Sequence, residues 1–273
     1  MNLGSLFSPA APFRSLWRQR DLLWQMTGRD TRSRYRGSAM GLFWSAINPL
    51  LMLTIYTFFF SEVFQAKWPG ATQDRTEFAL ALYIGLLLHG FFTECVVRAP
   101  GLIVGNANLV KKVVFPLEIL PAVGIGSAAF HLLIGLGIWF TFRVVFGGEL
   151  HPGALLLPIV ILPLALMALG FSWMLASLGV YLRDVAHLVP MVATVLLFAS
   201  PVFYPAAALP EPYRTLIAAS PLTVPIEQAR AVLLHGVMPG WLSLAAYAAL
   251  ALLVAILGYA WFQATRKGFA DVL

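Results

Sequence analysis

The chain has 273 residues, of which 60% are hydrophobic and only 11% are charged, and its mean hydropathy is +0.81. Soluble domains average about 25% charged residues, so this composition excludes an ordinary soluble protein and indicates an integral membrane protein. The net charge of +6 does not indicate a nucleic-acid partner, because the basic residues lie mostly between apolar runs.

The N-terminal segment, residues 1–36, contains a predicted amphipathic helix. On a helical wheel one side is apolar, with Phe13, Leu16, Trp17, Leu23 and Trp24. The opposite side is polar, with Arg14, Arg18, Asp21 and Gln25. Trp and Leu on one face and Arg on the other are typical of a helix that lies flat in the cytoplasmic interface of a membrane. A soluble helix that packs on a partner protein is the alternative.

Four arginines at positions 29, 32, 34 and 36 precede a charge-free run from 37 to 61. Such a run fits a membrane span, which needs about 20 apolar residues, and cationic flanks stay on the cytoplasmic side. Arg32, Arg34 and Arg36 also form a dense cationic patch at the depth of lipid head groups. We interpret them as candidates for binding an anionic lipid head group, with a role in topology alone as the alternative.

The apolar runs predict six membrane spans. Charge-free or nearly charge-free runs cover residues 37–61, 78–93, 119–142, 150–182, 185–210 and 231–265. The second run ends at Glu94, which is four residues before Arg98 and could pair with it, and the last helix is expected to begin near Gly240. With both termini in the cytoplasm, 13 basic residues lie inside and 5 outside, as the positive-inside rule requires. The fold class is therefore an all-α integral membrane protein, with six transmembrane helices in residues 37–266 and a cytoplasmic tail, 267–273.

An inner loop at 99–116 is too apolar for a solvated linker. Asn108 could cap a short helix over 109–115, which Pro116 would stop. An amphipathic helix on a cytoplasmic loop is a plausible docking element for another protein, and simple anchoring at the interface is the alternative. The candidate docking residues are Asn108, Leu109, Val110, Lys111, Lys112 and Phe115.

Six prolines between residues 201 and 225 break any continuous helix in the segment that follows the fifth run. The segment nevertheless stays apolar, and broken apolar backbone is expected only where protein or a water-lined cavity satisfies its polar groups. We predict a short re-entrant hairpin at 206–237, on the outer side between the fifth and sixth spans. A kinked extracellular loop is the alternative.

No catalytic or metal-binding pattern stands out. The single cysteine, Cys95, excludes an internal disulfide, and the five histidines share no ligand spacing, although His89 and His131 lie inside predicted spans. No lysine stands in a phosphate-binding Gly-Lys-Ser/Thr context, so ATP and Mg²⁺ would have to bind a separate subunit. Arg183 and Asp184, in the tightest inner turn, are expected to fix helix ends.

Aromatic residues are frequent in the first and fifth spans. Most are expected to face lipid or to pack, and a subset that faced a pore could stack on sugar rings. The candidates for such a subset are Trp44, Tyr56, Phe203 and Tyr204.

Several motifs, in order along the chain, resemble those of polysaccharide-export permeases, the membrane subunits of type-2 ATP-binding-cassette exporters for O-antigen, capsule or teichoic acid. The similar segments are Arg-Tyr-Arg-Gly-Ser at 34–38, Gly-Leu-Phe-Trp-Ser at 41–45, Asn-Pro at 48–49, Asn-Leu-Val-Lys-Lys at 108–112, Phe-Pro at 115–116, Tyr-Leu-Arg-Asp at 181–184, Ser-Pro-Val-Phe-Tyr-Pro at 200–205 and Ser-Pro-Leu at 220–222. The family often has Asn-Pro where this chain has Ser220 and Pro221, which is a mild departure.

The resemblance implies a bacterial inner-membrane protein in which two permease copies work with two separate ATPase subunits. It implies that the loop 99–116 holds the helix that couples to the ATPase, and that the first and fifth spans line a channel for a lipid-linked glycan. O-antigen is the favoured substrate. The alternatives are a permease for capsule, teichoic acid, a small molecule or a lipid, and, in a different class, a membrane-embedded glycan-lipid transferase.

Overall fold

The computed structural model describes residues 11–38, 40–59, 75–111, 115–146 and 148–273. Within these ranges the secondary structure is helical, without strands. Four helical stretches are long and apolar enough to cross a membrane, namely Glu77–Val104, Ile119–Val145, Pro152–Tyr181 and Trp241–Val272. They correspond to the second, third, fourth and sixth predicted spans.

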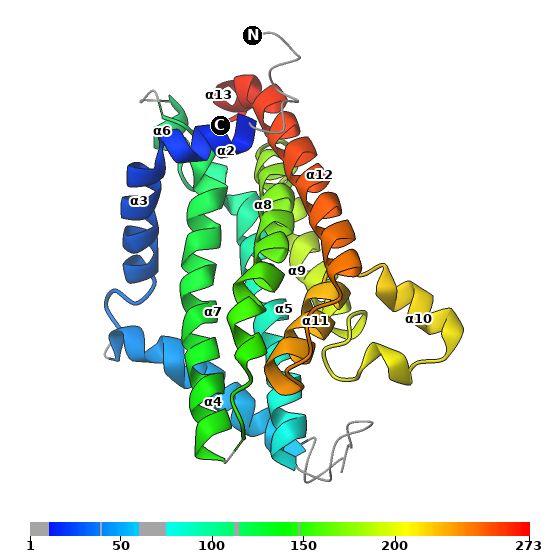
Figure 1. Ribbon diagram of the computed structural model, residues 1–273. Helices are drawn as coiled ribbons and strands as arrows, with labels where there is room; N and C mark the ends of the chain where they lie inside the picture. The colour runs from blue at the N-terminus through cyan, green and yellow to red at the C-terminus, as the bar shows by residue number, and fades with distance from the viewer. Residues whose placement is uncertain (1–10, 39, 60–74, 112–114, 147) are drawn as a thin grey trace.

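The long helices α5 (Arg75–Val104), α7 (Ile119–Val145), α8 (Leu157–Tyr181) and α12 (Trp241–Thr265) run side by side in one bundle (Figure 1). Gly240 directly precedes α12, which confirms the expected start of the last helix. Helix α5 continues beyond Glu94 to Val104, so residues 99–104 of the predicted inner loop belong to this helix, and its charged residues Glu94 and Arg98 pair with Arg34 and Asp30 of the N-terminal segment.

The first and fifth apolar runs form shorter helices than the span prediction required. Helix α4 covers Trp44–Thr57 and crosses α7 and α5 at the lower end of the bundle (Figure 1), and the end of the predicted first span, residues 60–61, lies outside the described residues. Helix α9 covers Val185–Phe198, and the chain then leaves the helical conformation at the segment that contains Pro201 and Pro205. A proline alone does not end a helix in this bundle, since α9 itself continues through Pro190, but two prolines four residues apart remove two N–H donors from this segment.

The predicted hairpin at 206–237 contains two helices, α10 (Glu211–Ala218) and α11 (Thr223–Leu234). Helix α10 projects from the bundle, whereas α11 packs against α5 and α8 (Figure 1). The side chains of Ile226, Ala229 and Val232 are fully buried. Helix α11 is thus part of the protein core, whereas α10 is exposed apart from Ile217.

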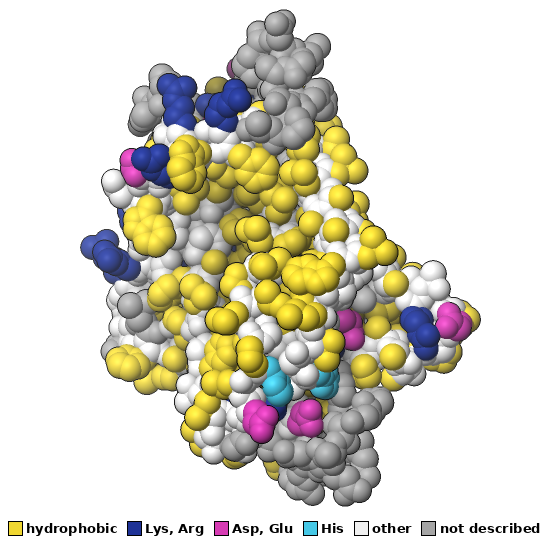
Figure 2. Space-filling model, viewed as in Figure 1, with side chains coloured by type: hydrophobic (Ala, Val, Ile, Leu, Met, Phe, Trp, Pro, Cys, Tyr) yellow, Lys and Arg dark blue, Asp and Glu magenta, His cyan; other side chains and the backbone are white. Residues whose placement is uncertain are grey.

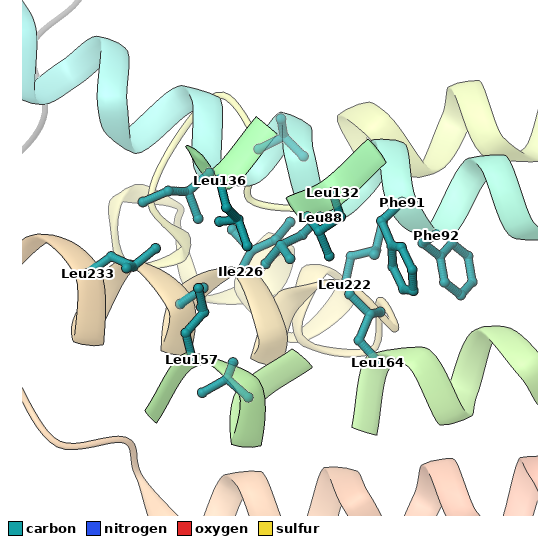
Figure 3. Close-up of a cluster of buried hydrophobic side chains, with 14 of the residues drawn as sticks. Leu88, Phe91, Phe92, Leu132, Leu136, Leu157, Leu164, Leu222, Ile226 and Leu233 are labelled. Carbon is teal, nitrogen blue, oxygen red and sulfur yellow. The ribbon is translucent and has the colours of Figure 1, made fainter. Parts of the chain in front are cut away.

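The main core lies between α5, α7, α8 and α11, and Figure 3 shows its leucine, isoleucine and phenylalanine side chains meeting from these helices. Two tryptophans are fully buried and still satisfy their indole N–H groups, since Trp139 donates to the carbonyl of Leu80 and Trp173 to that of Glu118. Each tryptophan therefore buries a large apolar area without leaving its N–H donor unsatisfied.

The N-terminal segment forms two helices that meet at Gln19, where the sequence predicted one. Helix α2 (Ala11–Arg18) crosses the upper end of the bundle, and α3 (Arg20–Ser33) runs down beside α7 (Figure 1). Close approach of α3 is possible at Gly126 of α7, because a Cβ there would lie 2.7 Å from a side-chain atom of Thr27. The predicted apolar face is divided, since Leu16 and Leu23 pack on the core while Phe13, Trp17 and Trp24 are exposed.

Helix α6 (Ala107–Lys111) and the C-terminal helix α13 (Phe269–Val272) lie at the same end of the bundle as α2 (Figure 1). On the face of the molecule shown in Figure 2, hydrophobic side chains cover the middle, and Lys and Arg side chains gather at the upper left edge, over α2 and α3. The two ends of the described chain therefore share one basic end of the molecule.

Candidate functional site

One face of α3 carries an exposed cationic groove. Arg29 and Arg32, three residues apart, lie on the same side of α3, Arg36 follows in the turn after this helix, and all three are exposed. They line a groove of about 560 Å³ together with Trp24, Gln25, Gly28 and Ser33. Two of the three arginines predicted to bind a head group are thus brought together, and Arg29 joins them.

Arg34, the remaining predicted head-group residue, points away from this groove. Its guanidinium forms an ion pair with Glu94 of α5 and lies 3.5 Å from the Asp30 carboxylate, one helical turn before it. The Arg34 side chain is only 22% exposed. Paired and half-buried in this way, Arg34 serves the packing of the N-terminal segment rather than the cationic face.

Asp30 is the centre of this packing contact. Both of its carboxylate oxygens accept hydrogen bonds from Arg98 of α5, at 3.0 and 3.1 Å, and one also accepts from the Ser127 hydroxyl of α7 at 2.7 Å. A bidentate Arg–carboxylate pair is among the stronger polar contacts in proteins. The pair expected between Glu94 and Arg98 is replaced by two longer-range pairs, which tie α3 to α5 and α7.

His131 of α7, whose role the sequence left open, links Tyr35 to Glu94. Because a carboxylate only accepts, His131 Nδ1–H donates to Glu94 at 2.9 Å, and Nε2 is then free to accept from the Tyr35 hydroxyl, also at 2.9 Å. Burial raises the pKa of Tyr35 above that of an ordinary phenol, so its hydroxyl stays protonated and available as the donor.

These polar residues line one wall of a cavity of about 510 Å³ between α4, α5, α7 and α9, which we call the polar cavity. Its lining includes Arg34, Tyr35, Glu94 and His131, and also Trp44, Ser45, Asn48, Tyr56, Tyr83 and His89. Two of the four predicted pore aromatics, Trp44 and Tyr56, therefore face the same space.

The other two predicted aromatics are placed beside this cavity. The Phe203 ring lies 6.1 Å from that of Tyr56 and stacks on Phe198 at 5.6 Å. The hydroxyl of Tyr204 donates to the carbonyl of Phe198, so it helps to close the break after α9 and does not line the cavity. The sequence identified the aromatic residues, but only their packing separates these roles.

His89 is a packing residue that also borders the polar cavity. Its Nε2–H donates to the carbonyl of Ala193 in α9 at 3.0 Å, so the ring joins α5 to α9. Across the described part of the chain, no group of three or more His, Cys, Asp or Glu residues is arranged to hold a metal ion.

The predicted docking loop reaches the basic end of the bundle. Helix α6 begins at Ala107, so Asn108 lies inside it rather than at its cap, and both Asn108 and Lys111 are exposed. Leu109, Val110 and Phe115 pack against a second cluster of buried side chains, which includes Ile103, Trp173 and Phe269, and Lys112 lies outside the described residues.

Arg266, after the end of α12, holds the last part of this loop. It donates to the Glu118 carboxylate at 2.8 Å and to the carbonyl of Phe115 at 2.9 Å. Near the same end, Arg183 and Asp184 are exposed in the short turn between α8 and α9, and the Asp184 carbonyl accepts from the N–H groups of His187 and Leu188. The Asp184 side chain makes no capping hydrogen bond, so the backbone alone begins α9.

Sequence reasoning missed Asp30 and Tyr83. Asp30 is the one acidic residue within a run of arginines, and its position one turn before Arg34 was a usable signal. Tyr83 gave no signal, because a tyrosine in an apolar run is an ordinary packing residue until its neighbours are known.

A bundle with four apolar helices of membrane-spanning length defines a polytopic membrane protein. The sequence model of the ABC-2 type transporter family matches residues 21–234, which is most of the chain, and the chain belongs to this family. It is similar to the O-antigen export system permease protein RfbA of Klebsiella pneumoniae, with 27% identity over 256 residues that cover 93% of this chain and 95% of that protein. It is also similar to RfbA of Myxococcus xanthus, with 27% identity over 260 residues that cover 94% and 97% of the two chains.

Proposed function

We propose that the chain is the permease subunit of an ATP-driven exporter that moves a lipid-linked polysaccharide of the O-antigen type across the bacterial inner membrane. The observation that carries the proposal is the similarity to two O-antigen export permeases along more than nine tenths of the chain. In the proposed assembly, two copies of this chain work with two ATPase subunits, which bind ATP and Mg²⁺.

The proposed topology has six crossings, with the end that carries α2, α6 and α13 in the cytoplasm. In it, α4 and α9 provide the first and fifth crossings, and α10 with α11 forms a hairpin that re-enters from the outer side. The burial of α11 against α5 and α8 supports the re-entrant arrangement. If the non-helical backbone beside α11 were exposed to lipid instead, its N–H and C=O groups would have no hydrogen-bond partners. The distribution of basic residues supports the orientation.

In this proposal the ATPase docks on α6. Asn108 and Lys111 are exposed there, while Leu109 and Val110 connect the helix to the core. The two bonds of Arg266 to Glu118 and Phe115 make the end of the loop stiff, so a push on α6 is transmitted to α7 and α12 rather than absorbed locally.

The anionic head group of the lipid carrier is assigned to the groove of Arg29, Arg32 and Arg36. Three exposed arginines that line one groove attract phosphate, and each guanidinium can bind it bidentately. Arg34 is not part of this assignment, because Glu94 and Asp30 already compensate its charge.

The test is polysaccharide export by cells that produce the chain with its ATPase, measured as glycan at the cell surface. Changing Arg29, Arg32 and Arg36 together to Gln is expected to reduce export strongly while the permease still inserts and assembles. The matched control changes Arg14, Arg18 and Arg20 to Gln, which removes the same charge from exposed positions outside the groove. Equal loss of export in both triple variants would show that the groove has no specific role in binding the head group. Loss of membrane insertion would show that its arginines determine the topology instead.

The proposed substrate class is tested by comparing cells that produce the wild-type chain with cells from which it has been deleted. Deletion of the chain should leave undecorated cell surfaces and lipid-linked glycan accumulated inside. Accumulation of a small molecule or lipid, with normal surface glycan, would instead support a permease of that class and contradict the proposed function.

A further inference from the structure

Helix α12 marks the two edges of the membrane hydrocarbon. Exposed tryptophans stand near its ends, Trp241 and Trp261, and the large side chains exposed between them are leucines. Tryptophan is enriched at both interfaces of a bilayer. The helix rises about 30 Å from one tryptophan to the other, which is the thickness of the hydrocarbon. Trp261 therefore marks the edge of the hydrocarbon at the end of the bundle that carries α2, α6 and α13.

The ends of α12 and α7 lie at the same level, because an ion pair joins them. Arg266, which follows α12, donates to Glu118, which precedes α7, at 2.8 Å. Trp261 stands five residues before Arg266, and α7 runs in the opposite direction to α12 (Figure 1). The edge of the hydrocarbon on α7 therefore falls about five residues after Glu118, near Val123.

Helix α3 reaches past this edge. Its Asp30 and Thr31 side chains bond the Ser127 hydroxyl, at 2.7 and 3.2 Å, and Tyr35, just after the helix, bonds His131 at 2.9 Å. Ser127 and His131 stand four and eight residues beyond the edge, which puts them about 6 and 12 Å inside the level of the hydrocarbon. The arginine groove of α3 therefore lies below the level at which Trp261 places the head groups.

At this depth the surface of α3 is charged, whereas α7 and α12 are apolar. Arg29, Arg32 and Arg36 are exposed in the groove, whose lining, as far as the structure describes it, contains no acidic residue. Leu133 of α7 and Leu257 of α12 are exposed instead. A charge at hydrocarbon depth is costly, and a bilayer accommodates it by snorkelling of the side chain, local thinning and entry of water. The contrast indicates that the leaflet edge is lower over α3 than over α12.

We propose that the arginine groove draws the phospholipid head groups of this leaflet down to the level of Ser127 and His131, so that the bilayer is thinned by about 6 to 12 Å over α3. The ligand is the phosphate of an ordinary membrane phospholipid, which a guanidinium can bind bidentately. A second copy of the chain fits this face less well, because a twofold contact through it would set arginines against arginines.

The thinning deepens the proposed function and rests on it, since there this leaflet is the cytoplasmic one. The head group of a lipid-linked substrate would reach the groove from a leaflet that is already lowered. The hydrocarbon that it must cross would be thinner by the same amount.

The test measures depth by fluorescence quenching, on the intact chain in bilayers of phosphatidylethanolamine and phosphatidylglycerol. Ser33→Cys places a thiol in the groove, and Leu257→Cys places one on α12 at a matched level, by the count of residues from Arg266. The native Cys95 is buried, so bimane labels the new thiol in each variant. Two quenchers are compared, a lipid with a nitroxide on its head group and a lipid with a nitroxide deep in its acyl chain.

The two positions should show opposite orders of quenching. At position 33 the head-group nitroxide is expected to quench severalfold more than the chain nitroxide, and at position 257 severalfold less. The same order at both positions, whichever nitroxide prevails, would show that the bilayer is not thinned locally and would overturn the proposal. Quenching by neither lipid at position 33, with normal quenching at position 257, would show that protein covers the groove and would overturn it too.

The same assay tests the arginines themselves. Changing Arg29, Arg32 and Arg36 to Gln should shift the quenching ratio at position 33 severalfold toward the chain nitroxide, and the control change of Arg14, Arg18 and Arg20 should not. An unchanged ratio in the groove variant would contradict the proposal, and the comparison of the two positions stands even if that variant fails to insert.

Failure of the thinning and failure of the proposed function are distinguishable, because the quenching needs no glycan. Absent thinning beside normal glycan export would overturn this inference alone. Opposite orders of quenching, in a chain whose deletion leaves the surface glycan unchanged, would support the thinning and overturn the proposed function.

Discussion

Arg230 offers the sharpest test of how the outer hairpin is held. This residue of α11 is 3% exposed, and its guanidinium donates to three backbone carbonyls, those of Ala81, Pro201 and Val202. The last two belong to the proline-broken segment after α9, where no helix satisfies the carbonyls. We expect Arg230→Gln to release this segment from α5 and α11.

The magnitude follows from the bonds that are lost. A hydrogen bond from a charged group contributes about 1.5–3 kcal/mol, but a shorter amide can keep one of the three, and losing the buried charge removes its desolvation cost. The two bonds that are lost contribute together about 3–6 kcal/mol, and after the recovered desolvation cost we expect a loss of about 4 kcal/mol in the free energy of unfolding.

The assay is denaturant unfolding in detergent micelles, combined with limited proteolysis of the segment 199–222. Arg214→Gln in α10 is the matched control, because Arg214 donates to the carbonyls of Ala207 and Leu209 and pairs with Glu211, but on the surface. Its loss should cost less than about 1 kcal/mol. The reasoning would be refuted if both variants lost the same small amount of unfolding free energy and the segment 199–222 of Arg230→Gln stayed resistant to proteolysis. The buried guanidinium would then not be what holds the hairpin.

Two further predictions concern helix packing. Gly258→Ala should destabilise the protein by about 1–3 kcal/mol or more, because the new Cβ would lie 2.2 Å from the backbone oxygen of Gly170. The control is Gly137→Ala, whose new Cβ meets nothing within 4 Å and which should be neutral or stabilising. Thermal unfolding measures both variants. In a double-mutant cycle, Asp30→Asn and Arg98→Gln should show a coupling of about 1–2 kcal/mol through their bidentate pair, and additive effects would contradict the anchoring of α3 on α5.

The long helices could be predicted well from the sequence, because the hydropathy of a span is a local property. The charge-free runs at 119–142 and 150–182 became α7 and α8, and Gly240 marks the start of α12 as expected. The break in the segment of Pro201 and Pro205 was predicted from a cluster of prolines, whereas the single prolines 49, 100, 163 and 190 lie inside continuous helices. The family resemblance, carried by short motifs in order, was confirmed by the match to the ABC-2 type transporter family.

The partners of the charged residues could not be predicted, because they are far apart in the chain. Arg34 and Glu94 are separated by 60 positions and Arg230 and Ala81 by 149, so no spacing rule could connect them. For the same reason the three arginines predicted to act together were divided, with Arg34 turned to the core.

What the amino-acid sequence determined by itself is therefore a membrane protein built of apolar helices, with a predicted majority of its basic residues on one side and a broken segment before the last helix. The tertiary structure alone decided which side chains meet: the anchoring of α3 through Asp30, the bonding of the broken segment by Arg230, and the cavity with its unpaired Tyr83 hydroxyl. The physical reason is that partitioning into a membrane depends on each segment's own composition. A buried polar contact, in contrast, depends on distant residues that only the packed bundle brings within about 3 Å of each other.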